Sequence, residues 1–537
     1  MPNDRRPPII VAIAALLLAT AGVWLSAGAG GDTHRAHVVV DGVPLDEVHP
    51  SGDRHPGVVV AHGFAGSARL MAPFGDTLAA RGYVVVLLDF SGHGANTHPL
   101  PSGDDALQHD LDVAMAHLRS LPDVDPARVA LVGHSMGATA VTRYAGSHPD
   151  VSATVAISLP YASVARTGDP KHLLLMVGAL EFPAFHEVAT TAAAVSPGRS
   201  LVVVPAVEHI SILYAPRTHR ETAAWLDKSL GNPVSSGPLP SPFRRPAGAA
   251  LLLLAFAIGL FPLTRLLLGR PAAESAHSDV PPATSSTRSD APPATSSTRS
   301  DAPPAAGSAR SDAPALGRPA RSDAPALGRP AAGLSRFDAP LIGRVSLAAA
   351  GAALVGALLA PILPSNRLPL DLGGYVVGLT GVTGALLLAY TMRTRTRRRA
   401  GPKIQVLIMV YAAAITVPLQ LGVTHVVPTG IRWWLLLAVW AAFTLLTYAT
   451  ERATNGNVYA ALAVSAVTLL ALTGAAITGL TSSFVLLVVP LLALLMLWQA
   501  AWSTLLNRAG ASPWLTAAAG SLLLAWPIAT ALPITGG

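Results

Sequence analysis

The sequence contains no cysteine and few charged residues, and each shortage excludes a class of protein. Without cysteine the chain has no disulfide, no thiolate nucleophile and no cysteine-ligated metal site. Charged residues make up 12% of the 537 residues, whereas soluble domains carry roughly 25%. Hydrophobic residues make up 51%. This composition excludes an ordinary soluble enzyme of the same length, and we expect much of the chain to lie in lipid.

The basic residues behind the formal net charge of +7 stand beside apolar runs and in a proline-rich tract. They are not interleaved with aromatic residues, as they would be on a surface that binds single-stranded nucleic acid. Membrane topology explains their positions better than phosphate binding does. We therefore expect a lipid bilayer, and no nucleic acid, as a partner.

The amino terminus has the features of an export signal. Arg5 and Arg6 precede an uninterrupted apolar run over 9–25, and small residues follow over 26–31. This order predicts that residues 1–30 are a signal anchor or a signal peptide. The run is just long enough to cross a bilayer, so both the uncleaved and the cleaved form stay open. In either form the next segment is exported.

Charged residues and histidines return over 31–231, where β-rich runs alternate with helical stretches. This change predicts an extracytoplasmic folded domain, followed by a proline- and serine-rich linker at 232–246. The remainder is predicted as a transmembrane span at 247–268, a cytoplasmic linker at 269–343 and a transmembrane domain of about seven spans at 344–537.

The cytoplasmic linker has low complexity. Arg-Ser-Asp recurs in it every 11 residues, at Arg288, Arg299, Arg310 and Arg321. Its proline, alanine, serine and threonine content supplies no apolar face of helical or strand period, so we expect this tandem repeat to be disordered. An expanded spacer and a docking or phosphorylated segment are both compatible with this composition.

Counting the amino-terminal run, nine apolar stretches approach the roughly 20 residues that a spanning helix needs. They lie at 9–25, 247–268, 345–363, 373–391, 404–424, 433–449, 458–480, 484–504 and 514–532. If the amino terminus is cytoplasmic, the inner loops contain the basic cluster from Arg393 to Lys403, then Arg452 and Arg508, whereas the outer loops contain only Arg367 and Arg432. Because basic loops stay inside, this asymmetry predicts that the folded domain and the carboxyl terminus lie outside.

The sharpest motif is Gly133-His134-Ser135-Met136-Gly137, which has the form G-x-S-x-G. The run at 128–132 before it reads as a buried strand, and the stretch at 136–147 after it reads as a helix. A strand, a tight turn and a helix form a nucleophile elbow, in which glycine on both sides lets the strained backbone lift the serine hydroxyl clear. In this context the sequence resembles the α/β-hydrolase superfamily.

The resemblance implies an α/β fold with a mostly parallel sheet flanked by helices, joined here to an all-α transmembrane domain. The segment His62-Gly63-Phe64-Ala65-Gly66-Ser67, after a strand at 57–61, looks like the superfamily's His-Gly oxyanion loop. By that resemblance the backbone N–H groups of Phe64 and Met136 would hold the developing oxyanion, and His62 would brace the loop.

A second turn follows the strand at 83–88. The segment from Asp89 to Gly94 is similar to the Asp-x-x-Gly-His-Gly turn of many members of the superfamily. In that turn Asp89 and His93 are expected to be structural.

Two further residues complete the implied catalytic triad. After the elbow the sequence predicts strands at 153–157, 172–177 and 201–204. Glu181 follows the second of these and His209 the third, where the superfamily has its acid and its histidine. A serine hydroxyl is a poor nucleophile until histidine takes its proton, and the imidazolium then needs a fixed carboxylate. Asp169 and Glu208 are competing acids. Since Asp169 precedes its strand and Glu208 adjoins His209, we expect Glu181 to orient the histidine.

The sequence therefore predicts a membrane-tethered, extracytoplasmic serine hydrolase that cleaves carboxylic esters, with lipid or cell-envelope acyl esters near the membrane as substrates. It predicts no cofactor and no metal. The stretch at 158–171, where many relatives insert a helical lid, is short, so we expect an open, lid-poor, esterase- or lipase-like site. A peptidase or an acyltransferase would use the same triad, and a transport or signalling protein could carry the domain as a non-catalytic ligand-binding module. The membrane region resembles no family that motifs identify.

Overall fold

The structure is a computed structural model of the whole chain. It describes residues 6–536, with gaps at 32, 53, 101–102, 104, 166–167, 233–236, 269–336, 392–404, 406–408, 410–415 and 509–510. Met1–Gly269 and Ser335–Gly537 form one compact unit. The predicted 11-residue repeat falls outside the described residues.

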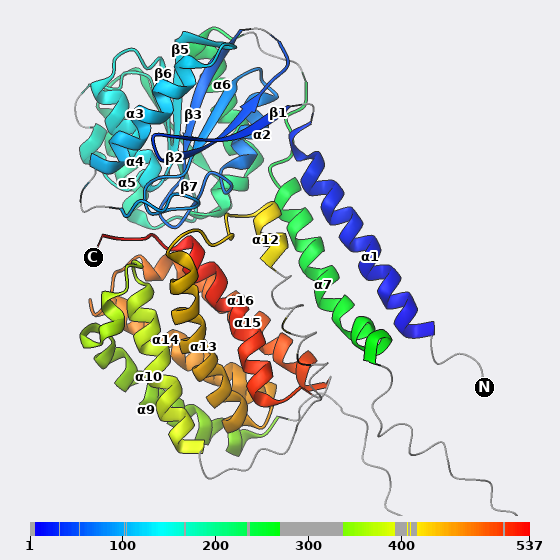
Figure 1. Cartoon of the computed structure of the whole chain (residues 1–537). Coiled ribbons are helices and arrows are strands. Elements are labelled where there is room, and N and C mark those ends of the chain that lie inside the picture. The colour runs from blue at the N-terminus through cyan, green and yellow to red at the C-terminus, as the bar shows by residue number, and fades with distance from the viewer. Residues whose placement is uncertain are drawn as a thin grey trace, which may run out of the picture. The chain divides into compact units, whose positions relative to one another are not determined.

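The amino-terminal half of this unit contains an eight-stranded sheet (Figure 1). The strands are β1 (His34–Val40), β2 (Val43–His49), β3 (His55–Ala61), β4 (Val84–Leu88), β5 (Val124–His134), β6 (Ala153–Ile157), β7 (Leu173–Gly178) and β8 (Arg199–Val204). Their order across the sheet is β1-β2-β4-β3-β5-β6-β7-β8. The six strands predicted from the sequence correspond to β3 to β8, and the predicted mostly parallel α/β fold is confirmed.

Sequence analysis did not identify β1 and β2, which form an antiparallel hairpin at the sheet edge. Asp41 and Gly42 connect them, and both have positive φ, at 46° and 83°. This is the backbone of a two-residue type I′ turn, for which Asp-Gly is a preferred sequence. The dipeptide between two β-rich runs was therefore a usable signal.

Helices cover both faces of the sheet (Figure 1). They are α2 (Ala72–Ala79), α3 (Asp105–Ser120), α4 (Met136–Ser147), α5 (Pro183–Ala194) and α6 (Pro216–Leu230), with short 3₁₀ turns η2 (Ala162–Ala165) and η3 (Ser211–Tyr214). Successive strand residues alternate between two cores: Val58 and Val60 face a cluster with Phe74 of α2, whereas Val59 packs with Leu111 of α3. The buried valine and leucine runs therefore serve both layers, as is typical of parallel strands.

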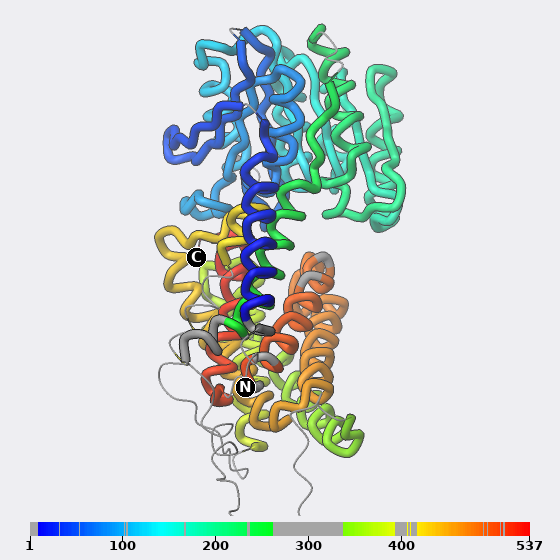
Figure 2. Tube along the Cα trace, turned by 90° about the vertical axis from the view of Figure 1, so that its right-hand side faces the viewer, coloured from blue at the N-terminus to red at the C-terminus, as the bar shows by residue number. Residues whose placement is uncertain are grey.

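Two helices connect this domain to the rest of the chain. They are α1 (Arg6–Ala27), which continues into η1 (Gly28–Gly30), and α7 (Arg244–Leu268), and they lie side by side (Figure 2). A Cβ at Gly248 would lie 2.7 Å from the carbonyl oxygen of Gly22, so the small residues let the two backbones approach closely. At the domain end, the buried Asp76 carboxylate pairs with Arg35 and Arg245.

The carboxyl-terminal half is helical. Its elements are α9 (Ala339–Leu359), η4 (Ala360–Ile362), η5 (Pro364–Arg367), α10 (Gly373–Thr391), α12 (Thr416–Gly422), α13 (Arg432–Thr454), α14 (Val458–Ile477), α15 (Val485–Arg508) and α16 (Pro513–Ala531). We call α9 to α16 the helical region. Among the described residues of the chain, six helices are long and apolar enough to cross a membrane. They correspond to six of the nine predicted spans.

The other three predicted spans are not among these six helices. The span at 247–268 coincides with α7, and the span at 484–504 coincides with α15. The apolar part of α15, Val488–Thr504, is shorter than the six helices above. Most of the span predicted at 404–424 lies outside the described residues, apart from α12.

The domain built on this sheet should lose stability in mild acid, because several of its histidines are buried as neutral rings. Burial lowers the pKa of His219 to about 4, from 6.5. The unfolded state therefore binds more protons than the folded state between these values, and the free energy of unfolding falls as the pH drops from about 6.5 to about 4. For His219 the total loss is at most about 3 kcal/mol.

We expect His219→Gln to flatten this dependence, measured as the unfolding temperature of the purified chain at pH 7.5 and pH 5. His219 bonds to Thr77 Oγ1 and to the Leu213 carbonyl, both at 2.8 Å, and glutamine offers a donor and an acceptor without titrating. An equal drop in unfolding temperature for the variant and the wild type would contradict the assignment.

Candidate active site

The turn between β5 and α4 holds Ser135 in a strained conformation, with φ 53° and ψ −116°. The glycines on both sides allow this turn because no side chain fits there. A Cβ at Gly133 would lie 2.3 Å from the Gly137 carbonyl oxygen, and a Cβ at Gly137 would lie 2.5 Å from the His62 carbonyl oxygen. The backbone geometry is that of a nucleophile elbow, which presents the serine hydroxyl at the end of the sheet.

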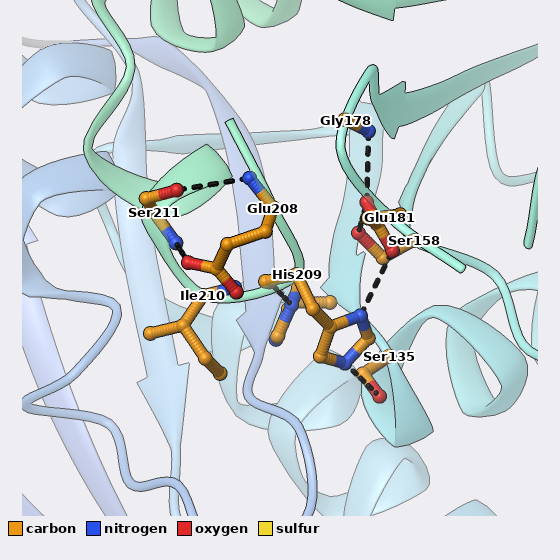
Figure 3. A network of polar contacts seen from close by, with 9 residues as sticks. Ser135, Ser158, Gly178, Glu181, Glu208, His209, Ile210 and Ser211 are labelled. Carbon is orange, nitrogen blue, oxygen red and sulfur yellow. Dashed lines mark hydrogen bonds and ion pairs between the residues drawn. The ribbon is translucent and has the colours of Figure 1, made fainter. Parts of the chain in front are cut away.

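Three predicted residues meet at this turn (Figure 3). The Ser135 hydroxyl lies 3.0 Å from His209 Nε2, and His209 Nδ1 lies 2.9 Å from Glu181 Oε2. The serine follows β5, the glutamate follows β7 and the histidine follows β8. Because the carboxyl ends of parallel strands emerge at one edge of a sheet, residues far apart in the sequence converge there.

The oxygen of the Glu181 carboxylate that does not face His209 is also hydrogen-bonded. Its Oε1 accepts hydrogen bonds from the Ser158 hydroxyl at 2.7 Å and from the Gly178 N–H at 2.8 Å (Figure 3). Its side chain is fully buried. With one oxygen fixed in this way, the other oxygen faces the imidazole, which therefore donates its Nδ1–H to the carboxylate.

Sequence analysis missed Ser158 as a member of this arrangement. Ser158 follows β6 directly, it is buried, and it has a φ of 55°. A polar residue at the carboxyl end of the strand next to β7 was the available signal. The sequence alone does not reveal that its hydroxyl points at Glu181.

The two competing acids lie elsewhere. The Glu208 carboxylate folds back on its own turn and accepts from the N–H groups of Ile210 at 2.9 Å and Ser211 at 2.7 Å (Figure 3). Asp169 lies before β7, at the opposite end of that strand from Glu181. Among the described residues, Glu181 is therefore the carboxylate bonded to the His209 ring.

A second histidine, His134, is hydrogen-bonded to the backbone of His209. His134 Nε2 lies 2.9 Å from the backbone carbonyl oxygen of His209, and the two rings are 4.8 Å apart. Burial holds the pKa of His134 well below its ordinary value, so the ring is neutral and donates from Nε2. This bond fixes the loop after β8 against the elbow. His134 is the x residue of the motif, and its identity gave no sign of this role.

The loop at 62–67 passes directly over Ser135, since a Cβ at Gly63 would lie 3.1 Å from the Ser135 Cβ. His62 braces this loop: its Nδ1 donates to the Gly63 carbonyl at 2.7 Å, and its Nε2 accepts from the Phe90 N–H at 3.1 Å. Burial lowers the pKa of His62, which keeps the ring neutral and able to accept at Nε2.

The two amides expected to bind an oxyanion flank the same turn. Met136 is the first residue of α4, where helical N–H groups have no partner within the helix. In the part of the chain that the structure describes, neither the Phe64 nor the Met136 N–H is bonded to a protein acceptor. Both donors are therefore available to a ligand at Ser135.

Asp89 and His93 lie behind this loop. The Asp89 carboxylate accepts from the N–H groups of Ala68 at 2.6 Å and Ala95 at 2.8 Å. The His93 Nδ1 bonds to the Ser91 carbonyl at 2.9 Å, and burial holds its pKa well below its ordinary value. These contacts tie the turn after β4 to the loop after β3.

The loops around the three side chains expose large apolar residues. Tyr161 follows β6, Leu180 and Phe182 follow β7, and Ile210 follows β8, with exposed fractions of 56%, 67%, 54% and 43%. We call these four residues the apolar rim. Between β6 and β7 the described residues contain only the four-residue turn η2 and no inserted helix. In the described part of the chain, no group of three or more histidine and acidic side chains is arranged as a metal site.

Comparisons with known proteins place this domain in a family of hydrolases. Residues 52–193 match the family model described as serine aminopeptidase, S33. An uncharacterized protein of Mycobacterium tuberculosis is 32% identical over 170 residues, which are 31% of this chain and 52% of that protein. Cutinase 1 of Thermobifida cellulosilytica is 29% identical over 106 residues, which are 19% of this chain and 38% of the cutinase.

This chain spans about half the length of the first of these relatives. Among solved structures, an esterase of Pyrococcus furiosus is 20% identical and covers 37% of this chain and 94% of its own, with a TM-score of 0.31. The mostly parallel sheet, the elbow at Ser135 and the matched family model agree. The domain formed by β1 to α6 belongs to the α/β-hydrolase superfamily.

Proposed function

We propose that this protein is a membrane-tethered serine hydrolase that cleaves carboxylic esters outside the cytoplasmic membrane. The observation that carries the proposal is the unbroken relay from the Ser135 hydroxyl through His209 to the buried Glu181 carboxylate, with separations of 3.0 Å and 2.9 Å. A relay of this geometry activates a serine that is otherwise a poor nucleophile. A pure binding module has no need of it.

In the proposed reaction, His209 Nε2 takes the proton of the Ser135 hydroxyl as its oxygen attacks the ester carbonyl. The carbonyl oxygen becomes an oxyanion, which the N–H groups of Phe64 and Met136 stabilise. His209 then gives the proton to the alcohol oxygen as the ester C–O bond breaks, leaving an acyl group on Ser135. Water, activated by His209, hydrolyses this acyl-enzyme and restores the serine. Glu181 holds the tautomer of His209 and offsets its charge in both steps.

The apolar rim supports an ester with a hydrocarbon acyl chain, such as a lipid or cell-envelope ester. Its four side chains expose apolar surface on the loops that carry Ser158, Glu181 and His209, where polar peptide groups would lose hydrogen bonds to water without replacement. The cutinases among the relatives agree with ester cleavage. The matched family is described by an aminopeptidase, so a peptidase is the second candidate. Comparing turnover of p-nitrophenyl esters and aminoacyl p-nitroanilides separates the two.

The contacts of the domain support the predicted alternation of loops between the two sides of the membrane. Four segments of the helical region touch the domain, through Thr424, Arg432, Phe484 and Ile534. All four segments were predicted at the outer ends of their spans, on the side of the domain. These contacts require the four segments and the domain to lie on the same side of the bilayer. The basic residues of the other loops are what favours the outer side.

A fluorophosphonate probe is expected to label the purified chain at Ser135 and to abolish ester turnover in proportion. The relay activates this hydroxyl toward phosphorus as it does toward a carbonyl carbon. Labelling and turnover should both disappear in Ser135→Ala and persist in Ser147→Ala, whose hydroxyl bonds only within α4 and to His148. Labelling that survives Ser135→Ala would show another nucleophile and contradict the assignment.

Glu181→Gln should lower kcat about 10³-fold or more, because the amide cannot offset the charge of the imidazolium. The matched changes Glu208→Gln and Asp169→Asn should lower kcat less than about 10-fold by the same reasoning. Steady-state kinetics on a short activated ester, with unfolding temperature as the folding control, make the measurement. If Glu181→Gln kept a near-normal kcat while Glu208→Gln or Asp169→Asn lost most of its kcat, a different acid would orient His209.

Reporter fusions test the orientation. Alkaline phosphatase folds only outside the cytoplasm, so we expect activity from a fusion after Pro205 and silence from a fusion after Arg399, in the basic loop predicted inside. The reverse pattern would overturn the topology without touching the assignment of the relay.

A further inference from the structure

The loop over Ser135 is held by residues of the helical region as well as by its own domain. The Phe64 ring stacks on the Phe484 ring, with centroids 5.1 Å apart and an angle of 25° between the planes. Phe484 lies just before α15, in the short connection from α14. Ala65, which follows Phe64 in the loop, packs against the apolar cluster formed by residues of the helical region. The end of the same loop bonds across as well, since Ser67 Oγ lies 3.1 Å from Thr424 Oγ1.

The neighbouring turn after β4 is held in the same way. The fully buried Arg432 guanidinium, at the start of α13, donates to the Gly92 carbonyl at 2.7 Å. It also donates to the Ala529 and Leu532 carbonyls of α16, both at 2.9 Å. The carboxyl-terminal segment adds a bond from the Ile534 N–H to the same Gly92 oxygen, at 2.8 Å.

These two loops are joined to each other by hydrogen bonds that His62 and Asp89 accept. His62 accepts from the Phe90 N–H, and Asp89 accepts from the Ala68 N–H. The Phe64 ring also meets the His93 ring edge-on, at 5.9 Å. Contacts from four segments of the helical region therefore converge on the paired loops that carry one of the two oxyanion donors.

We propose that the helical region is part of the active site: Phe484 is a positioning residue that fixes the Phe64 N–H for the oxyanion. The inference rests on the proposed ester hydrolysis and adds a function for the helical region. The ring of Phe484 stacks on the ring of Phe64, whose N–H is one of the two proposed oxyanion donors. An N–H that is held before the reaction stabilises the transition state without reorganisation, which raises kcat.

The test is Phe484→Ala in the full chain, assayed with p-nitrophenyl butyrate. Phe484 is 38% exposed, so the variant should fold, and an unchanged unfolding temperature checks this. We expect kcat to fall about 10-fold or more, up to the roughly 10²- to 10³-fold that removing an oxyanion donor entirely would cost. KM should change less than about 2-fold. Phe484→Tyr keeps the stacked ring and should restore kcat.

The matched control is Phe337→Ala. Phe337, which lies just before α9, also forms an aromatic pair, but with Tyr459 of α14 and with no contact to the domain among the described residues. It should leave kcat unchanged. Equal kcat values for Phe484→Ala and the wild type would overturn the inference, and so would a rise in KM alone, which would mean that Phe484 binds substrate instead.

The failure of this inference is distinct from that of the proposed function. If the wild-type chain hydrolyses the ester and takes the fluorophosphonate while Phe484→Ala does both equally well, only the positioning role falls. If the wild-type chain does neither, the proposed function falls and carries this inference with it. In the expected outcome Phe484→Ala still labels to completion, more slowly, because Ser135 and His209 remain in place.

Discussion

The close approach of three backbone segments at Ser135 is the constraint on which the site depends. The elbow, the start of α4 and the loop after β3 meet so tightly that a Cβ at Gly63, Gly133 or Gly137 would lie 2.9 Å or less from a neighbouring atom. Only glycine permits this packing, and the packing in turn holds Ser135 at a φ of 53°. The strain is local, and the buried sheet around it keeps the turn from relaxing.

From this fixed point the parallel sheet supplies the rest of the relay. Its strands end at one edge, so the residues after β7 and β8 reach the elbow without any long side chain or inserted element. Precision then comes from bonds beyond the relay itself. Ser158 and the Gly178 N–H fix one oxygen of Glu181, and His134 fixes the backbone of His209. Each partner removes a rotation that would otherwise lengthen the relay.

The same edge of the sheet makes the contacts to the helical region. Arg432 joins α13, α16 and the turn after β4 through three carbonyl bonds, and Phe484 stacks on Phe64 in the loop after β3. Both terminal nitrogens of this buried guanidinium donate to carbonyl oxygens, and losing those acceptors would leave a buried charge without partners, so this junction favours one arrangement of the loops. The architecture therefore joins a lid-poor hydrolase domain to helices of membrane-spanning length.

The sequence by itself determined the features that depend on short stretches of chain. The elbow could be read because Gly, Ser and Gly stand between a buried strand and a helix, and the six parallel strands because each is a continuous apolar run. Only the tertiary structure decided which further side chains hold Glu181, His209 and the loop over Ser135 in place. Ser158 and Glu181, or Phe64 and Phe484, are adjacent because the sheet and the helices pack as they do, and no periodicity in the chain records it. Side-chain direction across such distances is set by packing, which local propensity does not encode.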